Sequence, residues 1–294
     1  MAQHKCTRWA VDLASWSPTL PQLAQAVAVI QAEERGRLQK FFYIDDFLSS
    51  LVGRLLMRKY VSVQSGMDYK EVQFARDVRG KPYWTQAANE CPNQMSFNVS
   101  HQGNFVLFAG VSMDTKVKVA EPTTFGVGVD VMKIEYSGGK SLSEFFRIMQ
   151  RKFSDSEWRY IRRPHHNEFD QVQAFMRHWC LKEAYVKELG VGITIDLQKI
   201  SFKVDTSREL SVAESPLTGT TLRCNDMLMH DWHFEEHLLH PKYCAAIAFR
   251  NCKPEEGKFE LLKMDQLLVE TESATSIEVV QYCREALRKE RRKS

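Results

Sequence analysis

The chain has 294 residues, enough for one large domain or two of ordinary size, and 44% hydrophobic with 26% charged residues is typical of a soluble globular protein. With 40 Lys and Arg against 37 Asp and Glu, the formal net charge of +3 is too balanced for a general nucleic-acid binder. No apolar run approaches the roughly 18 residues that span a bilayer, and none of the 7 cysteines forms a CxxC pair.

Helical periodicity dominates the first part of the chain. Apolar residues three and four apart predict one helix over residues 21–40 and a second over residues 45–63. The cations of the second helix, Arg54, Arg58 and Lys59, are expected mostly in solvent.

After residue 66 the apolar period changes to two and predicts a strand at residues 71–76. A basic turn follows, with Arg76, Arg79 and Lys81 around Gly80. Three cations within six residues can clamp an anion. An exposed hairpin turn with ordinary surface charge is the alternative.

Two further strands are predicted at residues 95–101 and 105–110. Ser100, His101 and Gln102 therefore lie at a strand-to-turn corner, where ligand-binding groups are frequent. A histidine in such a corner can equally be a structural residue.

Residues 112–124 are polar and predict a linker, which a buried strand at residues 125–132 follows. That strand carries Asp130, and a carboxylate in an apolar run is costly unless it is paired or bound to a metal. The alternative is a strand-end Asp that caps the next turn. The Gly-x-Gly-x-Asp spelling lacks the third glycine of a dinucleotide-binding fingerprint.

A long helix is predicted at residues 167–189, ended by Gly190. Trp179, Glu183 and Lys187 are four residues apart and lie along one stripe of it. Glu183 and Lys187 form either a surface ion pair or, if a nucleotide binds, a cation ligand and a phosphate ligand.

Strands are predicted in the remaining chain at residues 200–204, 220–223, 231–235 and 243–249, and a weak helix at residues 271–287. Four histidines, at positions 230, 233, 237 and 240, run from strand into loop, so no zinc site is expected from them. The basic end of the chain, residues 290–294, is expected to be mobile.

Three features occur together in order: Gly128-x-Asp130, Trp179-x-x-Lys182-Glu183-Ala184, and Lys187 one turn later. With Asn98-Val-Ser100-His101-Gln102 and Arg79-Gly80-Lys81-Pro82, this combination resembles the 4′-phosphopantetheinyl transferases of the surfactin-synthetase-activator type, and most closely their cytosolic eukaryotic members. The resemblance covers roughly residues 8–250.

The resemblance implies an α+β pseudodimer of two similar halves, each a small antiparallel sheet with packed helices, and coenzyme A bound between them. The halves would be residues 1–115 and 116–250, with an extension at 251–294 that is partly helical or mobile. The implied reaction moves the phosphopantetheine arm of coenzyme A to a serine of an apo acyl carrier protein, and adenosine 3′,5′-bisphosphate is the other product.

The resemblance also assigns roles to residues. Asp130 and Glu183 would hold Mg²⁺, Lys187 would contact coenzyme A phosphate, and Glu183 or a water that it orients would accept the serine proton. The implied coenzyme A ligands, besides Lys187, are Arg37, Arg76, Arg79, Gly80, Lys81, Asn98, Ser100 and His101.

One position departs from the bacterial pattern, in which a second acid follows the Asp by two residues. Met132 stands there and is no ligand for Mg²⁺, so a water or Gln102 would fill its place.

The implied partners are apo carrier domains of fatty-acid synthase, the mitochondrial carrier protein and an aminoadipate-type reductase, with basic and apolar residues of the segment 147–152 as plausible contacts. A cytosolic monomer without nucleic-acid or membrane partners is expected. The alternatives are a coenzyme A-dependent acyltransferase and a catalytically silent module that binds carrier proteins or coenzyme A.

Overall fold

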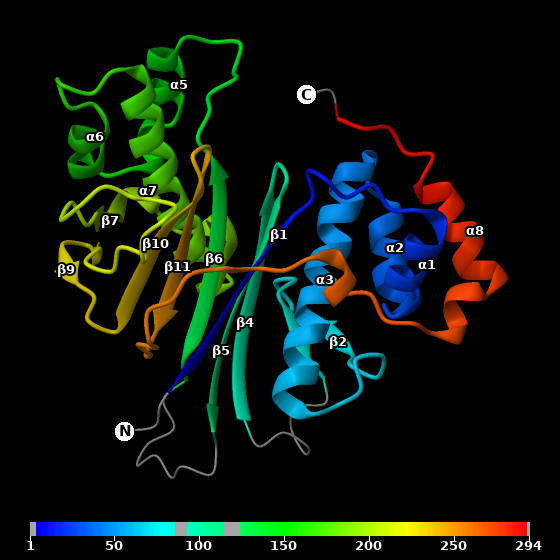
Figure 1. The fold of residues 1–294 in the computed structure, drawn as a ribbon. Coiled ribbons are helices and arrows are strands. Elements are labelled where there is room, and N and C mark those ends of the chain that lie inside the picture. Colours follow the sequence, from blue (N-terminus) through cyan, green and yellow to red (C-terminus); the bar gives the residue numbers. More distant parts are fainter. Residues whose placement is uncertain (1–3, 86–92, 115–123, 293–294) are drawn as a thin grey trace. The chain divides into compact units, whose positions relative to one another are not determined.

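The computed structural model describes residues 4–85, 93–114 and 124–292 (Figure 1). The helices are α1 (Leu20–Ala28), α2 (Ala32–Gln39), α3 (Ile44–Ser65), α5 (Leu142–Ile148), α6 (Asp155–Ile161), α7 (Glu168–Leu189) and α8 (Ile277–Ala286). The strands are β1 (Lys5–Asp12), β2 (Phe74–Arg76), β3 (Pro82–Trp84), β4 (Asn93–Gln102), β5 (Phe105–Asp114), β6 (Gly126–Lys133), β7 (Ile200–Lys203), β8 (Thr221–Cys224), β9 (Met227–Leu228), β10 (Trp232–His240), β11 (Tyr243–Arg250) and β12 (Glu260–Leu261). None of the helices so described is long and apolar enough to cross a membrane.

The strands form four small sheets, in the orders β12-β1-β5-β4, β10-β11-β6, β2-β3 and β7-β8-β9. Together with the helices they make an α+β fold, as the sequence predicts. The chain divides into two compact units. Unit 1 is Met1–Arg8, Met95–Asn98 and Ala109–Phe259, and unit 2 is Trp9–Gln94, Val99–Phe108 and Glu260–Ser294. Residues 112–114 of the predicted linker belong to β5, and residues 115–123 lie outside the described chain, so the boundary at 115 and 116 stays a prediction.

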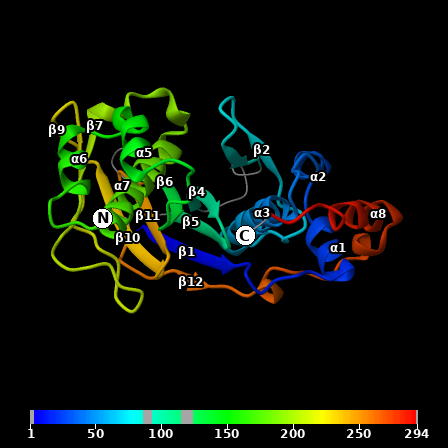
Figure 2. The ribbon, with the colours of Figure 1, turned by 90° about the horizontal axis from the view of Figure 1, so that it is seen from above.

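Unit 1 is organised around α7, which packs on β6 and β11 (Figure 2). The predicted helix is confirmed with both ends: Asn167 accepts from the Asp170 amide, and Gly190 ends the helix with a φ of 65°. Phe175 of α7 is buried among the aromatic rings of Phe146, Phe153 and Trp158. Hydrophobic burial against β6 and β11, and against these aromatic rings, therefore fixes how α7 is oriented on the sheet.

Unit 2 is organised around the buried helix α3, with α1 in contact with both α3 and α8 (Figures 1 and 2). The predicted single helix at residues 21–40 is wrong, because Gln31 is extended and separates α1 from α2. The carboxylate of Glu34 accepts from the Gln31 amide at 3.2 Å and begins α2. Arg58 takes up the Val29 carbonyl that the break leaves free, at 2.8 Å.

The described end of the chain contains one of the predicted helices. The helix predicted at residues 271–287 is shorter and begins at Ile277, where Ser276 caps it. Arg291 and Arg292 form ion pairs with Asp45 and Asp46 at the start of α3. Exposed ion pairs stabilise little, so the mobility of the basic end stays a prediction.

Candidate functional site

Close packing of β6 against α7 builds the centre of the candidate site. Gly126, Gly128 and Asp130 alternate along β6 and so share one of its faces. A Cβ on Gly128 would lie 2.0 Å from the Ala184 carbonyl oxygen of α7, and one on Gly126 would lie 1.8 Å from Glu188 Oε1. Only glycine allows this approach, and the approach brings Asp130 to the Glu183 turn of α7.

Substituting Gly128 by Ala is expected to lower the free energy of unfolding by about 1–3 kcal/mol, because the new methyl group collides with backbone rather than with a movable side chain. Gly139→Ala is the matched control, because a Cβ there meets nothing within 4 Å. Urea denaturation of both variants measures the difference. Equal stability of the two variants would show that α7 does not need the glycine.

Asp130, Glu183 and Lys187 come together in unit 1, as the sequence predicts. Lys187 Nζ donates to Asp130 Oδ1 at 2.6 Å, and Asp130 is 5% exposed. Burial raises the pKa of Glu183, the charge of Asp130 raises it further, and Lys187 and Lys152 act in the opposite direction. The negative charge of Asp130 beside Glu183 makes a place where a cation is stabilising.

The donor set fits Mg²⁺. This ion prefers hard oxygen ligands, keeps several waters, and is often held by one or two carboxylates together with substrate phosphates. Within residues 4–85, 93–114 and 124–292, no group of three or more His, Cys, Asp or Glu side chains could hold a metal. Asp130 and Glu183 would be two acidic ligands for the ion. The histidines of β10 form no metal site there either, although this segment is one continuous strand.

Asn98, a predicted coenzyme ligand, lies beside these residues in unit 1. Its Oδ1 accepts from the Val129 amide at 3.3 Å, and Ser96 Oγ accepts from the Val127 amide at 3.1 Å. β6 is an edge strand of its sheet, so these two side chains satisfy amides that no neighbouring strand pairs. Asn98 thus holds the strand that carries Asp130.

Lys182 belongs to the sequence motif but does not belong to the site. It is fully buried, and its Nζ lies 3.0 Å from Glu157 Oε2 and donates to the carbonyls of Leu197 and Ile200 at 2.9 and 2.5 Å. Burial lowers the pKa of Lys182 and raises that of Glu157, while their mutual attraction opposes both shifts. This ammonium anchors α7 to α6 and to the start of β7.

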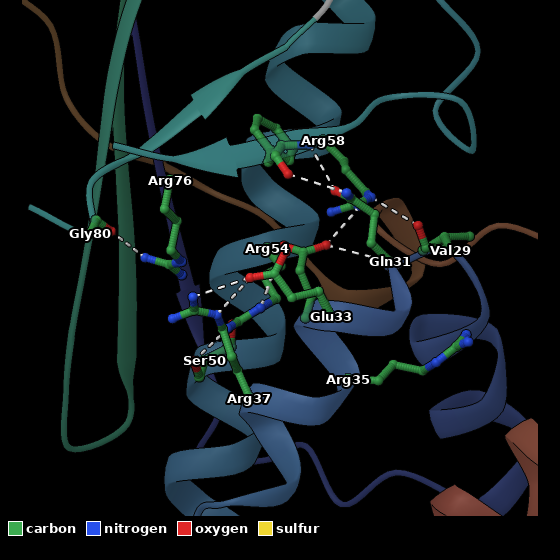
Figure 3. Close-up of polar contacts among 12 residues, drawn as sticks. Val29, Gln31, Glu33, Arg35, Arg37, Ser50, Arg54, Arg58, Arg76 and Gly80 are labelled. Atoms are coloured by element: carbon green, nitrogen blue, oxygen red, sulfur yellow. Dashed lines mark hydrogen bonds and ion pairs between the residues drawn. The ribbon is translucent and has the colours of Figure 1, made fainter. Parts of the chain in front are cut away.

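Unit 2 contains an arginine cluster, which consists of Arg37, Arg54, Arg58 and Arg76 (Figure 3). Arg37 pairs with Glu33 at 3.1 Å, and Glu34 lies 2.8 Å from Arg58 and 3.5 Å from Arg54. Figure 3 shows Arg37, Arg54 and Arg76 converging from α2, α3 and β2.

The arginine cluster carries more positive than negative charge. Burial and the nearby arginines lower the pKa of Arg54 to about 10, and burial and Arg37 lower the pKa of Arg76. An anion such as a phosphate would relieve this excess of positive charge. The expectation that Arg54 and Arg58 are solvated is wrong, since they are 5% and 0% exposed. Arg54 and Arg58 are four residues apart and therefore lie on the same face of the helix. This spacing is the sequence signal that both could contact one partner, which is Glu34.

The predicted basic turn is confirmed as a tight hairpin between β2 and β3. Asp77 Oδ1 accepts from the amides of Arg79 and Lys81, both at 2.9 Å, and Gly80 has a φ of 86° that only glycine adopts readily. Arg76 Nη1 donates to the Gly80 carbonyl at 2.5 Å. The turn therefore presents its cations on a fixed backbone.

The predicted corner at the end of β4 is also present. Ser100 is buried, His101 is exposed, and Gly103 makes the turn with a φ of 55°. Ser100, His101, Gln102 and the arginine cluster all belong to unit 2, whereas Asp130, Glu183, Lys187 and Asn98 belong to unit 1. The role of Gln102 as a metal ligand, and a coenzyme site shared by both groups, stay predictions.

Comparison with known proteins gives matches along most of the chain. The family model described as "4'-phosphopantetheinyl transferase, N-terminal" matches residues 14–113, and the model of the "4'-phosphopantetheinyl transferase superfamily" matches residues 126–248. All of the candidate site residues fall within these two ranges.

Individual relatives agree with the family models. The L-aminoadipate-semialdehyde dehydrogenase-phosphopantetheinyl transferase of Xenopus laevis is 33% identical over 89% of this chain and 85% of its own length. The human protein of that name is 31% identical over 89% of this chain and 84% of its own length. A 4′-phosphopantetheinyl transferase of Bacillus subtilis is 25% identical over 76% of this chain and 88% of its own length. This chain therefore belongs to the 4′-phosphopantetheinyl transferase superfamily and is a transferase enzyme.

Proposed function

We propose that this enzyme transfers 4′-phosphopantetheine from coenzyme A to a serine hydroxyl of apo acyl carrier proteins and carrier domains in a Mg²⁺-dependent reaction. The observation that carries the proposal is the junction of β6 and α7, where Asp130, Glu183 and Lys187 converge. A silent binding module would not need the carboxylate of Glu183 at a raised pKa beside the buried Asp130 and its ammonium partner, Lys187.

The reaction breaks the phosphoanhydride bond of coenzyme A and forms a phosphodiester bond to serine. The serine oxygen bonds to the phosphorus that carries the pantetheine arm, the pyrophosphate bond to the nucleotide breaks, and adenosine 3′,5′-bisphosphate leaves. Glu183, or a water that it orients, accepts the serine proton. The raised pKa of Glu183 lies closer to neutral pH than its ordinary value, which suits a general base. When bound, Mg²⁺ neutralises charge that develops on the pyrophosphate oxygens.

Lys187 would contact both Asp130 and the substrate in this reaction. Its ammonium now neutralises Asp130, and a pyrophosphate oxygen would share it once Asp130 also binds the cation. We propose that Arg37, Arg76, Arg79 and Lys81 hold the nucleotide phosphates, and that Gly80, Asn98, Ser100 and His101 shape the rest of the coenzyme site. The arginine cluster supports this part, because it carries uncompensated positive charge.

We further propose which carrier proteins the enzyme modifies, where in the cell it acts and which oligomeric state it has. The name of the animal relatives includes an aminoadipate-semialdehyde dehydrogenase, which makes the carrier domain of an aminoadipate-type reductase the first substrate to test. Carrier domains of fatty-acid synthase and the mitochondrial carrier protein are further proposed substrates. We also propose that residues 1–115 and 116–250 are the halves of a pseudodimer and that the enzyme is a cytosolic monomer.

Mass spectrometry of an apo carrier protein tests the function. Incubation with this enzyme, coenzyme A and Mg²⁺ is expected to add one phosphopantetheine mass, and a carrier whose acceptor serine is replaced by Ala is expected to stay unchanged. The proposal fails if none of the three carrier classes gains this mass.

A further inference from the structure

Unit 1 contains a cavity of about 420 Å³, which Asp130, Glu183 and Lys187 do not line. Its lining residues come from α6, α7, β7 and β8 and from the segments next to them. Four cations line it, namely Arg159, Arg163, Lys203 and Arg223, and no Asp or Glu does. In a chain with nearly balanced charge, this local excess requires an explanation.

The four cations lack acidic partners in the described part of the chain. None of them forms an ion pair with a carboxylate there. Arg163 lies over the Tyr160 ring, 4.0 Å from its centre, and Arg223 donates to the Asp226 carbonyl at 2.7 Å. These contacts fix two guanidinium groups without neutralising them, so their charge is available to a ligand.

Hydrogen-bonding groups complete the lining. Ser156 and Ser201 place their hydroxyl oxygens 2.8 Å apart. His178 also lines the cavity, and its Nδ1 lies 2.8 Å from the Ala174 carbonyl oxygen. A carbonyl only accepts, so Nδ1 carries the proton, and burial lowers the pKa of His178 to about 3. The ring is therefore neutral, and its Nε2 can only accept a hydrogen bond.

We propose that this cavity is a second ligand site that binds a small organic phosphate ester, with the phosphate on the cations and a hydroxyl group donating to His178. The four cations and the serine hydroxyls match phosphate oxygens. The cavity volume is in the range of small-molecule sites and exceeds the need of an inorganic ion.

Calorimetric titration of the full chain with ribose 5-phosphate, a phosphate ester that carries hydroxyl donors, tests this site. The pocket variant is Arg159→Glu with Lys203→Glu, both exposed side chains whose replacement leaves the core unchanged. Lys199→Glu is the matched charge-reversal control, because Lys199 is exposed and does not line the cavity. Arg76→Glu controls for binding at the arginine cluster. Arg159→Gln and Lys203→Gln replace the double variant if it fails to fold.

The pocket variant is expected to bind ribose 5-phosphate at least about tenfold more weakly than the natural chain, since charge-assisted hydrogen bonds are lost. The Lys199→Glu chain is expected to bind as the natural chain does, and the Arg76→Glu chain is expected to keep the binding that the pocket variant loses. Loss confined to Arg76→Glu would place the ligand at the arginine cluster and overturn the proposal. Absence of binding by the natural chain at millimolar ligand, or equal loss in Lys199→Glu, would also overturn it. Because the readout is binding, these outcomes do not depend on the transferase activity.

Discussion

Replacement of Glu183 by Gln is expected to lower phosphopantetheine transfer by on the order of a thousandfold. The amide cannot accept the serine proton and is a weaker ligand for Mg²⁺ than a carboxylate. Glu168→Gln, an exposed position on the same helix, is the control and is expected to keep full activity. Carrier modification measured by mass spectrometry over time compares the two. Normal turnover by the Glu183→Gln enzyme would remove this residue from the chemistry.

The same substitution separates a functional role from a structural one. The pKa of Glu183 is raised in the folded chain, so protonation of this side chain favours the folded state. This contribution to stability is fully present below the ordinary pKa of 4.5 and is lost as the pH rises through the raised pKa. Without metal, Glu183→Gln is therefore expected to unfold at a higher temperature than the natural chain at pH 7. That difference is expected to disappear as the pH falls below 4.5. A variant less stable at pH 7 would mean that Glu183 supports the fold.

Replacement of Lys182 by Met is expected to lower the free energy of unfolding by about 3–5 kcal/mol. The change leaves Glu157 buried without its cation, and it leaves two carbonyl oxygens without their donor. Urea denaturation monitored by circular dichroism measures the loss. Lys199→Met, at an exposed position just before β7, is expected to change stability by less than about 0.5 kcal/mol.

A second substitution checks the stated cause. Adding Glu157→Gln to Lys182→Met removes the uncompensated charge, so part of the lost stability is expected to return. If the double variant is as unstable as the sum of the single ones, the ion pair is not the source of the effect. A stability loss below about 1 kcal/mol for Lys182→Met would contradict the anchoring role altogether.

Local signals in the sequence were enough for the elements that carry the site. α7 has an apolar stripe, an Asn that caps its start and a Gly that ends it, and all three act within a few residues. The hairpin turn at Gly80 follows from local backbone chemistry in the same way. Spacing of four residues also placed Glu183 and Lys187 on adjacent turns, although the close ion pair of Lys187 is with Asp130.

Contacts between distant parts of the chain were not predictable from local patterns. The split between α1 and α2 depends on Arg58, which approaches Val29 from another helix, so periodicity alone predicted one helix. The burial of Arg54 and Arg58 depends on Glu34 in the same way. In the sequence, Lys182 cannot be distinguished from an ordinary exposed lysine beside the site residues. Its structural role follows from its contacts with Glu157 and two backbone carbonyls, which are distant in the sequence.

Measuring both products of one reaction tests the account most directly. With this enzyme, coenzyme A, Mg²⁺ and an apo carrier domain, each carrier molecule is expected to gain one phosphopantetheine while one adenosine 3′,5′-bisphosphate is released. Chelation of Mg²⁺ is expected to stop both. Release of the nucleotide without a gain in carrier mass, or a gain that persists with Mg²⁺ chelated, would contradict a metal-dependent transfer at Asp130 and Glu183.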